Sequence, residues 1–427
     1  MGKFTFNHNI LLRLLTVGAF ALLGLDFSRA AEALLGSADY RPTPERPFGF
    51  RGDGTGRFPG ATPVTEWSEK EARNIRWSAA VGSSFSAPIL LDKAIVVTAE
   101  PNIVLCLNRA DGSLLWKIAI TPAVITNEIF RAAAADYEAP KDGSGMTAAT
   151  PLTDGKLIYI VLANGIVQAV DLDGKTQWSA YIDAQQITGY GRSSSPLLIG
   201  GKLIVHMTNL HAFDAATGKQ LWLNADAPST YGSPIAMKLD GVELIVTPNG
   251  DVVRASDGKI LATEIGHATH TSPVTLDGSV YYGENALNAY SLSTTAKGRE
   301  LWTATITGEL FGSPLLHDGI MFTATGKGEL YAYDIKGQGE LNPLIEARKL
   351  FGDSEATAPA AYASLTLAGK HLFFNSNSGD TVVMEATREA RQIAKNQLTS
   401  GSGASPIFSG GDMFIRTRGK LFCIGRR

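Results

Sequence analysis

The chain has 427 residues, with 38 Lys and Arg against 41 Asp and Glu, and a formal net charge of −3. A balance this close to neutral argues against a dedicated nucleic-acid-binding protein, which needs a surplus of basic side chains to neutralise phosphates. Two cysteines cannot build a disulfide-rich scaffold, and a hydrophobic content of 44% excludes a disordered chain. The 45 glycines and 19 prolines favour a turn-rich, all-β protein.

Residues 1–30 have the pattern of a secretory signal peptide. Basic residues come first, an uncharged apolar run over 14–25 follows, and small residues come after it. The run is too short to cross a bilayer, which needs about 20 apolar residues. We expect cleavage after Ala30 or Ala33 and an exported protein, periplasmic or extracellular. An uncleaved membrane anchor is the alternative.

The rest of the chain divides into two parts. No cysteine lies just after the apolar run, so a lipoprotein anchor is not expected, and no later stretch is long and apolar enough to span a membrane. Residues 31–66 are rich in proline and glycine and show no regular period, which predicts a linker. Residues 67–427 are organised by an internal repeat of about forty residues.

The clearest repeat unit runs from Ser195 to Trp222. It contains four short apolar segments separated by turn residues, which predicts four β-strands. Each unit starts near a proline, and these prolines are Pro88, Pro151, Pro196, Pro234, Pro273, Pro314 and Pro406. Ser364 occupies the equivalent place in the long gap before the last proline, which makes eight starts. Serines such as Ser233 recur at these starts, and their repetition argues for a structural role.

A period of 40–45 residues with four strands per repeat is typical of a β-propeller blade. Large residues end several units and fit as plugs between neighbouring blades, at Trp116, Trp178, Trp222 and Trp302. The eighth unit lacks its last strand, whereas Trp77 lies on a strand that no unit precedes. The sequence therefore predicts an all-β, eight-bladed β-propeller with four-stranded blades, whose ring is closed by N- and C-terminal strands. Such closure removes an exposed sheet edge.

The unit Leu-x-Ala-x-Asp-x-x-Thr-Gly-x-x-x-Trp at Leu210–Trp222 resembles the repeat of the pyrroloquinoline-quinone (PQQ)-like β-propellers. Val104–Trp116 and Val167–Trp178 are close variants of it. The resemblance covers the chain from about residue 50 to its end, and it includes exported proteins known as PQQ-binding-like repeat proteins. The family contains quinoprotein dehydrogenases and the outer-membrane assembly factor BamB, so the resemblance is specific for the fold and weak for function.

The resemblance makes PQQ chemistry one alternative. Quinoprotein dehydrogenases hold PQQ with a calcium bound by Glu and Asn side chains, and they use an Asp base. They often carry a vicinal cysteine pair or a Cys-x-x-Cys-His haem segment. This chain has neither cysteine motif and is shorter than those enzymes. We expect no cofactor and no catalytic residues; PQQ with calcium in a quinoprotein oxidoreductase, intact or degenerate, is the alternative.

Two further groups of residues could carry chemistry. His267 and His270 are spaced like metal ligands, but only Glu264 lies nearby as a third, so no metal site is expected. Cys106 and Cys423 occupy the same repeat position in the first and last blades. Equivalent positions on stacked sheets lie about 10 Å apart, too far for a disulfide. Two buried thiols are therefore expected, with a disulfide as the alternative.

The candidate binding site is the rim of the central funnel. The residue three positions before each repeat start should lie in the connection that enters the innermost strand. These eight residues are Phe85, Ala148, Ser193, Tyr231, His270, Phe311, Ala361 and Gly403. Arg192 and His267 lie close to two of them in sequence. We take Phe85, Arg192, Tyr231, His267, His270 and Phe311 as a rim that binds a ligand or peptide; ordinary loop packing is the alternative.

The first two repeat starts are about 20 residues further apart than the period. The additional residues lie within 117–148, and the alanine-rich stretch 125–137 predicts a short helix there. Such an insertion either decorates the binding face or forms a surface loop without function. Together the sequence features favour an exported, non-catalytic binding or scaffold propeller, BamB-like in its type of role. Its expected partners are envelope or secreted proteins, or a small ligand or glycan at the funnel, and not nucleic acid.

Overall fold

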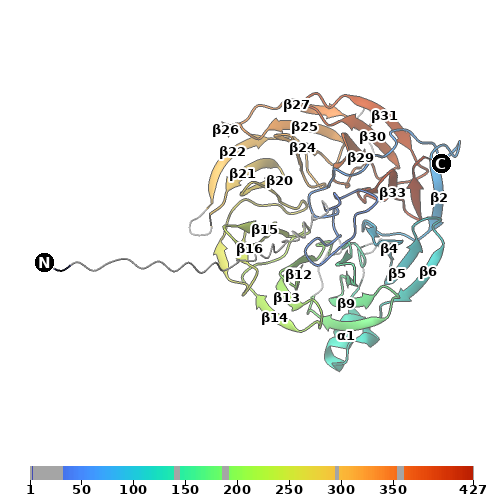
Figure 1. Cartoon of the computed structure of the whole chain (residues 1–427), viewed down its shortest axis with the longest axis vertical. Coiled ribbons are helices and arrows are strands. Elements are labelled where there is room, and N and C mark those ends of the chain that lie inside the picture. Colours follow the sequence, from blue (N-terminus) through green and yellow to red (C-terminus); the bar gives the residue numbers. More distant parts are fainter. Residues whose placement is uncertain are drawn as a thin grey trace. The chain divides into compact units, whose positions relative to one another are not determined.

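The computed structural model describes residue 2 and residues 32–138, 145–184, 192–293, 298–352 and 360–426. Within these ranges the regular structure is almost all short β-strands, which form eight mainly antiparallel sheets around a central axis (Figure 1). The predicted all-β, eight-bladed propeller with four-stranded blades is confirmed. The blades belong to the compact unit Ala33–Arg427, from which Met1–Glu32 is separate. Apart from Gly2, the expected signal peptide lies outside the described residues.

Blades 1 to 4 follow one another in chain order, and each is built from the axis outward. Their strands are β3 (Ile89–Leu90), β4 (Ala94–Ala99), β5 (Ile103–Asn108) and β6 (Leu114–Ala119); β7 (Leu152–Thr153), β8 (Leu157–Val161), β9 (Ile166–Asp171) and β10 (Thr176–Tyr181); β11 (Leu197–Ile199), β12 (Lys202–Met207), β13 (Asn209–Asp214) and β14 (Gln220–Asn224); β15 (Ile235–Leu239), β16 (Val242–Val246), β17 (Val252–Arg254) and β18 (Ile260–Ala262).

Blades 5 to 8 continue the ring in the same way. Their strands are β19 (Val274–Leu276), β20 (Ser279–Gly283), β21 (Ala286–Ser291) and β22 (Arg299–Thr305); β23 (Leu315–His317), β24 (Ile320–Ala324), β25 (Glu329–Asp334) and β27 (Ile345–Lys349); β28 (Thr366–Ala368), β29 (His371–Asn375), β30 (Asp380–Glu385) and β31 (Gln392–Gln397); β32 (Ile407–Ser409), β33 (Asp412–Arg416), β34 (Lys420–Ile424) and β2 (Ile75–Ala80). Two blades gain a fifth strand, because β1 (Arg57–Phe58) runs parallel to β28 and β26 (Gly339–Glu340) runs parallel to β22.

The ring closes as the sequence predicts, with strands from both ends of the chain. Strand β2 is the outermost strand of blade 8 and pairs antiparallel with β34. The register places Trp77 opposite Cys423, the same pairing that Trp116 makes with Cys106 in blade 1. The two cysteines are buried and are free thiols, and burial raises the pKa of each to about 12. Both therefore act as small core residues.

The burial of each strand explains its sequence. The second strand of a blade packs on both faces, and all six residues of β4 are buried. Such a strand reads as a continuous apolar run. The outermost strand has one face toward solvent, and β6 accordingly has exposed and partly buried residues in alternation. The core is therefore a set of apolar layers between neighbouring blades.

Tryptophan side chains join neighbouring blades near the outer edge. Each indole N–H donates to a backbone carbonyl of the next blade, and these bonds are Trp77 to Arg109, Trp116 to Leu172, Trp178 to Ala215, Trp222 to Ala255 and Trp302 to Ile335. The turn glycine of the next blade lies under the indole ring; a Cβ on Gly218 would come within 2.4 Å of Trp178. Gly218 also has a φ of +72°, which favours glycine. The predicted plugs are confirmed, and the recurring Thr-Gly and Asp-Gly turns serve them.

The proline- and glycine-rich segment 33–66 is not a free linker: it belongs to the same compact unit as the blades. This segment, the N-terminal strap, contacts the ends of the innermost strands of two blades and the turn that follows the innermost strand of a third. Phe48 pairs with Thr153 of blade 2, β1 pairs with β28 of blade 7, and Thr62 N–H donates to Gly410 O of blade 8. Buried apolar side chains anchor the strap, among them Leu35, Tyr40, Phe48 and Phe58. Their spacing has no period, so periodicity does not reveal them.

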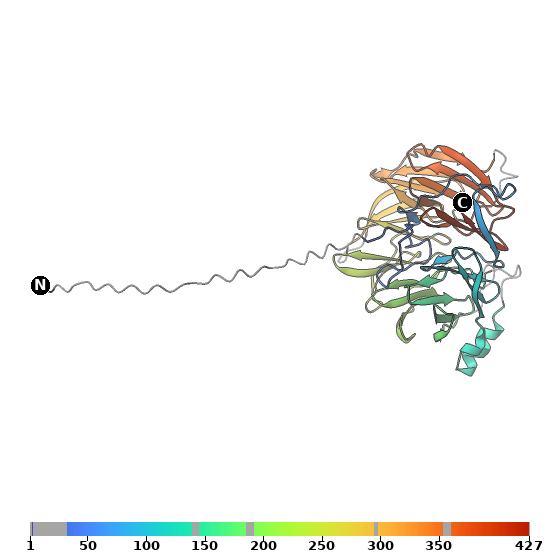
Figure 2. The same ribbon diagram turned by 45° about the vertical axis from the view of Figure 1, so that its right-hand side comes forward.

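The insertion within 117–148 forms the predicted short helix. A single 3₁₀ turn, η1 (Pro122–Val124), precedes α1 (Glu128–Asp136), whose N-cap Asn127 accepts hydrogen bonds from the backbone N–H groups of Ile129 and Phe130. Helix α1 projects from the edge of the ring (Figure 2). It is held to blade 2 by stacking of Phe130 on Tyr181, with centroids 5.2 Å apart. Residues 139–144 of the insertion lie outside the described residues.

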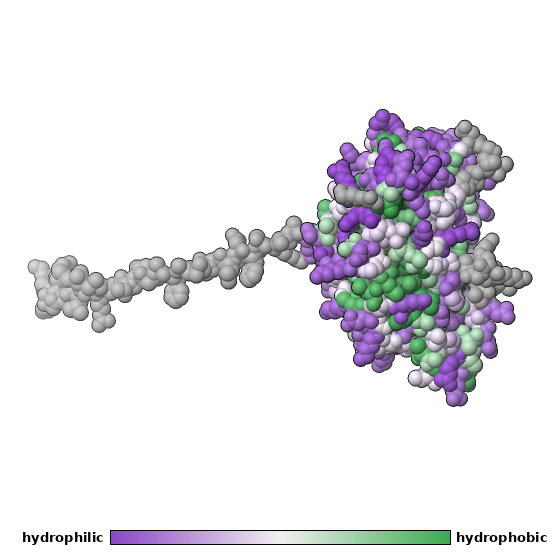
Figure 3. All heavy atoms as spheres, turned by 90° about the vertical axis from the view of Figure 1, so that its right-hand side faces the viewer, coloured by the Kyte–Doolittle hydropathy of each residue, from purple (hydrophilic) through white to green (hydrophobic). Residues whose placement is uncertain are grey.

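The outer surface is mostly hydrophilic, with local apolar areas. Figure 3 shows the side of the ring that carries β2 and β6, where apolar residues gather near the middle of the face. The exposed large apolar side chains of this part of the chain include Leu114 and Leu115 of β6, and Ile129 and Phe130 of α1. Within the part of the chain that the structure describes, no helix has the length and apolar character needed to cross a bilayer.

Candidate functional site: the central funnel

The connections that enter the innermost strands surround a cavity of about 540 Å³ on the propeller axis, the funnel. This volume lies within the range of pockets that bind small ligands. Two strap residues, Phe50 and Arg51, also line the funnel. Because the strap contacts the ends of innermost strands and a turn that follows one of them, these two residues form its inner end, which we call the floor. The mouth lies at the opposite end, where the connections enter those strands.

The structure brings four of the six predicted rim residues together in the lining of the funnel: Phe85, Tyr231, His270 and Phe311. Ala148, Ser193 and Gly403, at the equivalent position of other blades, line it as well. In blade 7 the lining residue is Tyr362 instead of the expected Ala361. The repeat of that blade has no proline to mark its start. The predicted start, Ser364, is one residue before Leu365, which is the true equivalent of the prolines.

Arg192 and His267 do not line the funnel. Arg192 donates through Nη2 to Ala184 O, and burial lowers the pKa of its guanidinium. His267 is exposed, with Nδ1 3.1 Å from Asn249 Oδ1 and Nε2 3.2 Å from Thr269 Oγ1. Both residues therefore lie beside the connections that carry the rim and outside the cavity itself.

The rings at the mouth form a continuous arc that spans blades 4, 5, 6, 7 and 1. Centroid distances along the arc are 5.6 Å for Tyr231–His270, 5.0 Å for His270–Phe311, 4.9 Å for Phe311–Tyr362 and 6.4 Å for Tyr362–Phe85. These distances are typical of stacked and edge-to-face ring pairs. Phe85 and Tyr362 remain 40% and 42% exposed. Gly403 of blade 8 lies between Tyr362 and Phe85 within the arc. Among the described lining residues, blades 2 and 3 contribute the small side chains of Ala148 and Ser193 on the other side of the mouth.

His270 is held in the arc by Glu284. The distance from His270 Nδ1 to Glu284 Oε1 is 2.8 Å, and Glu284 Oε2 accepts the backbone N–H groups of Thr269 and His270. The hydrogen bond with Glu284 raises the pKa of His270, although burial acts in the opposite direction. For Glu284, burial acts to raise the pKa, but its hydrogen bonds with His270 and Thr269 outweigh burial and lower it. The pair is therefore charged at mildly acidic pH.

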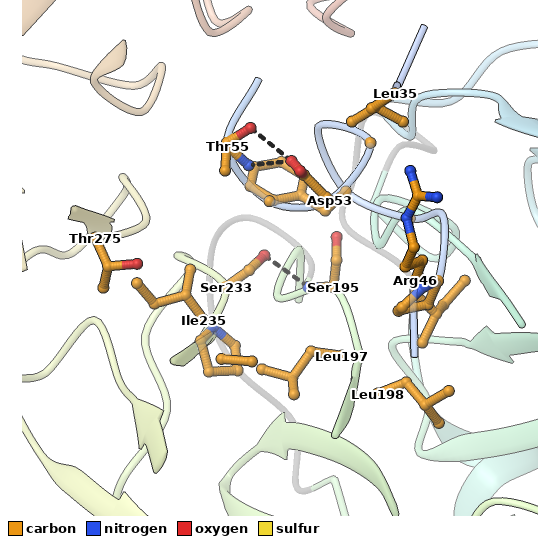
Figure 4. Close-up of a pocket in the computed structure, with 18 of the residues that line it drawn as sticks. Leu35, Arg46, Asp53, Thr55, Ser195, Leu197, Leu198, Ser233, Ile235 and Thr275 are labelled. Carbon is orange, nitrogen blue, oxygen red and sulfur yellow. Dashed lines mark hydrogen bonds between the residues drawn. The ribbon is translucent and has the colours of Figure 1, made fainter. Parts of the chain in front are cut away.

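Below the arc, hydroxyl groups form a collar around the axis. In seven blades a hydroxyl oxygen accepts a backbone N–H of the preceding blade at 2.8–3.1 Å. The hydroxyl belongs to the residue before the repeat-start proline or, in blade 7, to Ser364 before Leu365. The collar consists of Thr150, Ser195, Ser233, Ser272, Ser313, Ser364 and Ser405, all of which line the funnel. One link, from Ser195 N–H to the Ser233 hydroxyl, is visible in Figure 4. The structural role predicted for the repeated serines takes this form.

The collar is broken between blades 8 and 1, where Ala87 has no hydroxyl to offer Ser405 N–H. Arg416 of blade 8 crosses this seam. Its guanidinium donates to Thr98 O at 2.6 Å, to Gly82 O at 3.2 Å and to the Ser86 hydroxyl at 3.3 Å, all in blade 1. Arg416 is fully buried, and burial lowers its pKa to about 10.

Arg51 at the floor is the second buried arginine of the axis. It is only 2% exposed, and its Nη2 donates to Pro314 O at 2.8 Å and to Leu365 O at 3.4 Å. Its Nε and Nη1 are buried and have no hydrogen-bond partner among the described residues. Burial lowers the pKa of Arg51 to about 9, and the charge of Asp53 only partly offsets this effect. Arg51 lies within 31–66, the predicted linker, and no repeat or motif in the sequence marks it as a site residue.

A second, smaller cavity of about 340 Å³ lies between the strap and the innermost strands of blades 3 and 4, and it shares Phe50, Ser195 and Ser233 with the lining of the funnel (Figure 4). Its walls are Leu197, Leu198 and Ile235 on the blade side, with Arg46 and Asp53 on the strap side. Asp53 Oδ1 accepts hydrogen bonds from the backbone N–H and the hydroxyl of Thr55. Its carboxylate thus stabilises the turn of the strap, and the cavity separates the strap from the blades.

The described lining of the funnel offers few ligands for the calcium that would hold PQQ. Calcium takes six to eight oxygen ligands, several of them from carboxylates. Among the described residues that line the funnel, Glu309 is the single carboxylate, and no Asn or Asp side chain accompanies it. No group of three or more His, Cys, Asp or Glu side chains is arranged for a metal ion in the described ranges. The lining therefore lacks the donor set that the resemblance associates with the dehydrogenases.

Eight blades around a lined axial cavity define an eight-bladed β-propeller. The model of the family described as "Outer membrane protein assembly factor BamB" matches residues 64–294 and 249–341, together more than half of the chain. The chain belongs to this family of PQQ-like repeat β-propellers, as its repeat predicts.

Individual relatives are distant. BamB of Moranella endobia (strain PCIT) is 23% identical over 278 residues, which cover 62% of this chain and 66% of the relative. The quinohemoprotein alcohol dehydrogenase ADH-IIG of Pseudomonas putida is 27% identical over 146 residues, 32% of this chain and 19% of the enzyme. The chain thus spans less than two thirds of either relative. The crystal structure of BamB from Moraxella catarrhalis shares the fold, with a TM-score of 0.56, 12% identity, and coverage of 82% of this chain and 96% of that one.

Proposed function

We propose that this chain is an exported, non-catalytic binding propeller of the cell envelope, which holds a protein partner through the mouth of its funnel. The observation that carries the proposal is the arc of five rings on the funnel mouth, from Tyr231 through His270, Phe311 and Tyr362 to Phe85. Partly exposed aromatic clusters around a pocket are typical anchors of protein interfaces. The signal-like residues 1–30 and the membership of a BamB family support export and an envelope role.

The arc suits an interaction surface because its geometry is fixed before a partner arrives. Each ring comes from a different blade, and the hydroxyl collar beneath fixes the spacing of the blades. A preorganised surface loses little conformational entropy on binding. Across the mouth from the arc, the described lining residues Ala148 and Ser193 have small side chains, which suit the passage of an extended segment.

Affinity purification from the envelope fraction of the native host tests the proposal. The captured protein is identified by mass spectrometry, purified and titrated against the wild type and the triple variant Tyr231→Ala, His270→Ala, Phe311→Ala. We expect the triple variant to bind at least about 100-fold more weakly, since hot-spot truncations each cost about 2 kcal/mol. The control is Leu221→Ala with Leu223→Ala, which removes exposed side chains of β14 on the outer surface. Equal affinity of the triple variant and the wild type would refute the funnel as the binding site.

The alternatives give different results in direct assays. We infer that the funnel works without PQQ, because its lining offers calcium a single carboxylate. Addition of PQQ and calcium should then produce neither a bound chromophore nor oxidation of alcohols or sugars; a stable visible spectrum with turnover would establish the quinoprotein alternative. A glycan array tests the remaining class of ligand, because sugars also stack on aromatic rings, and a specific hit lost in the triple variant would replace the protein partner.

A further inference from the structure

We infer that the floor of the funnel binds a carboxylate, presented by the group that enters through the aromatic mouth. Arg51 and the hydroxyl collar form this site. The inference rests on the proposed role of the funnel as the binding site and specifies the chemistry of what it binds. A C-terminal or acidic side-chain carboxylate of a protein partner and a free organic acid share this chemistry.

Arg51 is a buried cation whose hydrogen-bond donors are only partly used. Its guanidinium is 2% exposed, and Nε and Nη1 have no partner among the described residues, although the side chain lines the funnel. The remaining nitrogen bonds two neutral carbonyls, Pro314 O and Leu365 O. The charge of Asp53 offsets the burial of this cation only in part, and no carboxylate among the described residues hydrogen-bonds it. A buried cation in this state is unfavourable, and two unused donors add to the penalty. A carboxylate fits this arrangement, because guanidinium and carboxylate match in geometry and charge.

The collar hydroxyl groups have hydrogen-bond donor capacity left for a ligand on the axis. The collar oxygens already accept backbone N–H groups, so their remaining polar function toward the axis is to donate. Among the hydrogen bonds of the described residues, only Ser405 of the collar donates its hydroxyl hydrogen, to Ser364 O at 3.4 Å. A hydroxyl that accepts one hydrogen bond becomes a better donor in the next. The axis therefore presents donors to an acceptor group.

The charged side chains of the funnel lie at different depths, with Arg51 at the floor and Glu309 at the mouth. Arg51 bonds Pro314 O, the residue after the collar hydroxyl of Ser313, so its guanidinium lies just below the collar. Glu309 precedes Phe311 by two residues and raises the pKa of His270, which places it at the mouth. One buried guanidinium balances one negative charge. The floor thus suits a monoanionic carboxylate better than a dianionic phosphate, while the rings at the mouth suit an apolar or aromatic body.

Calorimetric titration of the wild-type protein tests the charge of the ligand without any substitution. The probes are phenylacetate, the uncharged phenylacetamide, phenyl phosphate, and the tripeptide Ala-Ala-Phe with a free or an amidated C-terminus. We expect phenylacetate and the free-acid tripeptide to bind about 10- to 100-fold more tightly than their amides, as hydrogen bonds to charged groups do. Equal binding of acid and amide would overturn the inference. Tighter binding of phenyl phosphate than of phenylacetate would overturn the assignment to a carboxylate.

Substitutions assign the effect to Arg51. Arg51→Met should abolish the preference for the acid over the amide, whereas Arg51→Lys should retain a reduced preference because it keeps the charge. Arg46→Met is the matched control, since Arg46 belongs to the same strap but lines the other cavity. If Arg51→Met fails to fold, the acid–amide comparison on the wild type still decides. An unchanged preference in a folded Arg51→Met would refute the site.

The two proposals fail in distinguishable ways. Acid-selective binding that depends on Arg51, with no partner bound at the mouth, would support the carboxylate site and refute the protein-binding role. A partner lost in the triple variant, with no acid preference in the probes, would do the reverse. If both hold, phenylacetate should compete with the partner for the funnel, and the free-acid tripeptide should compete more strongly than its amide.

Discussion

Two kinds of joint hold the ring together, and they differ in how they satisfy polar groups at the axis. Seven joints use one neutral link, a backbone N–H of one blade to a hydroxyl of the next. The eighth, between blades 8 and 1, has no such hydroxyl and instead uses the buried charge of Arg416. Interfaces between consecutive repeats are thus joined by the same collar hydrogen bond each time. The interface between the first and last blades is joined instead by several hydrogen bonds from the single side chain of Arg416.

The largest effect is expected at the eighth joint. Arg416→Met should lower the free energy of unfolding by about 3 kcal/mol, because it leaves the carbonyls of Gly82 and Thr98 buried without a donor. Denaturant unfolding followed by tryptophan fluorescence measures the change. Arg348→Met is the control: Arg348 also bonds two carbonyls of a neighbouring blade, Glu389 O and Ala390 O, but it is only partly buried. We expect it to lose about 1 kcal/mol or less. Equal losses for the two variants would show that burial at the eighth joint adds nothing.

A smaller effect is expected at an ordinary joint. Ser272→Ala removes the acceptor for Ser233 N–H and should lower the free energy of unfolding by about 1–2 kcal/mol. Ser272→Thr keeps the hydroxyl and should behave like the wild type, since Thr150 already holds a collar position in blade 2. The same denaturant titration compares the two variants. If alanine and threonine give the same stability, the collar hydrogen bonds do not stabilise the ring.

A single substitution can give the interface between blades 8 and 1 the collar hydrogen bond that the other seven interfaces have. Ala87→Ser would offer Ser405 N–H the missing acceptor and complete the collar. We expect a gain of up to about 1 kcal/mol, the usual net value of one buried hydrogen bond. Ala148→Ser is the control, because it adds a hydroxyl to the same cavity outside the collar. A gain of equal size in both variants, measured as a shift in denaturation midpoint, would mean that the break in the collar is unimportant.

The smallest effect concerns pH, which should separate the rim from the eighth joint. The folded pKa of His270 is raised, so its contribution is complete below the unfolded value near 6.5 and is lost as the pH rises through the folded value. The folded pKa of Glu284 is lowered, so its contribution is lost only in acid. The stability difference between wild type and His270→Gln, under about 1 kcal/mol, should be larger near about pH 5.5 than near about pH 8.5.

The eighth joint supplies the contrast for this measurement. Burial leaves the pKa of Arg416 at about 10, above the range tested, so the loss in Arg416→Met should be the same at both pH values. Thermal unfolding in matched buffers measures both differences. A pH-independent effect of His270→Gln would contradict the ion pair with Glu284, and a pH-dependent effect of Arg416→Met would contradict a charge that is constant in this range.

Local sequence signals predicted the blades and most of the funnel mouth. The prolines and tryptophans recur once in most blades and so mark the repeat. The position three residues before each start proline predicted four residues that line the funnel together, namely Phe85, Tyr231, His270 and Phe311. Tyr362 escaped because its blade lacks the proline that marks the start. Arg51 escaped for a different reason: contacts distant in sequence bury the strap, and such contacts leave no period in a single chain. Repetition therefore reveals the scaffold, while the floor of the site depends on a segment outside the repeat.

The pairing of β2 with β34 imposes an order on folding. Strands β2 and β34 share one sheet although more than 300 residues separate them, so the ring cannot close until β34 is available. A chain that emerges N-terminus first must therefore keep blade 8 incomplete until β34 has been synthesised. The strap bonds blades 2, 7 and 8 and can take its final position only after those blades exist. The floor of the funnel, with Arg51, is thus among the last parts of the molecule to form.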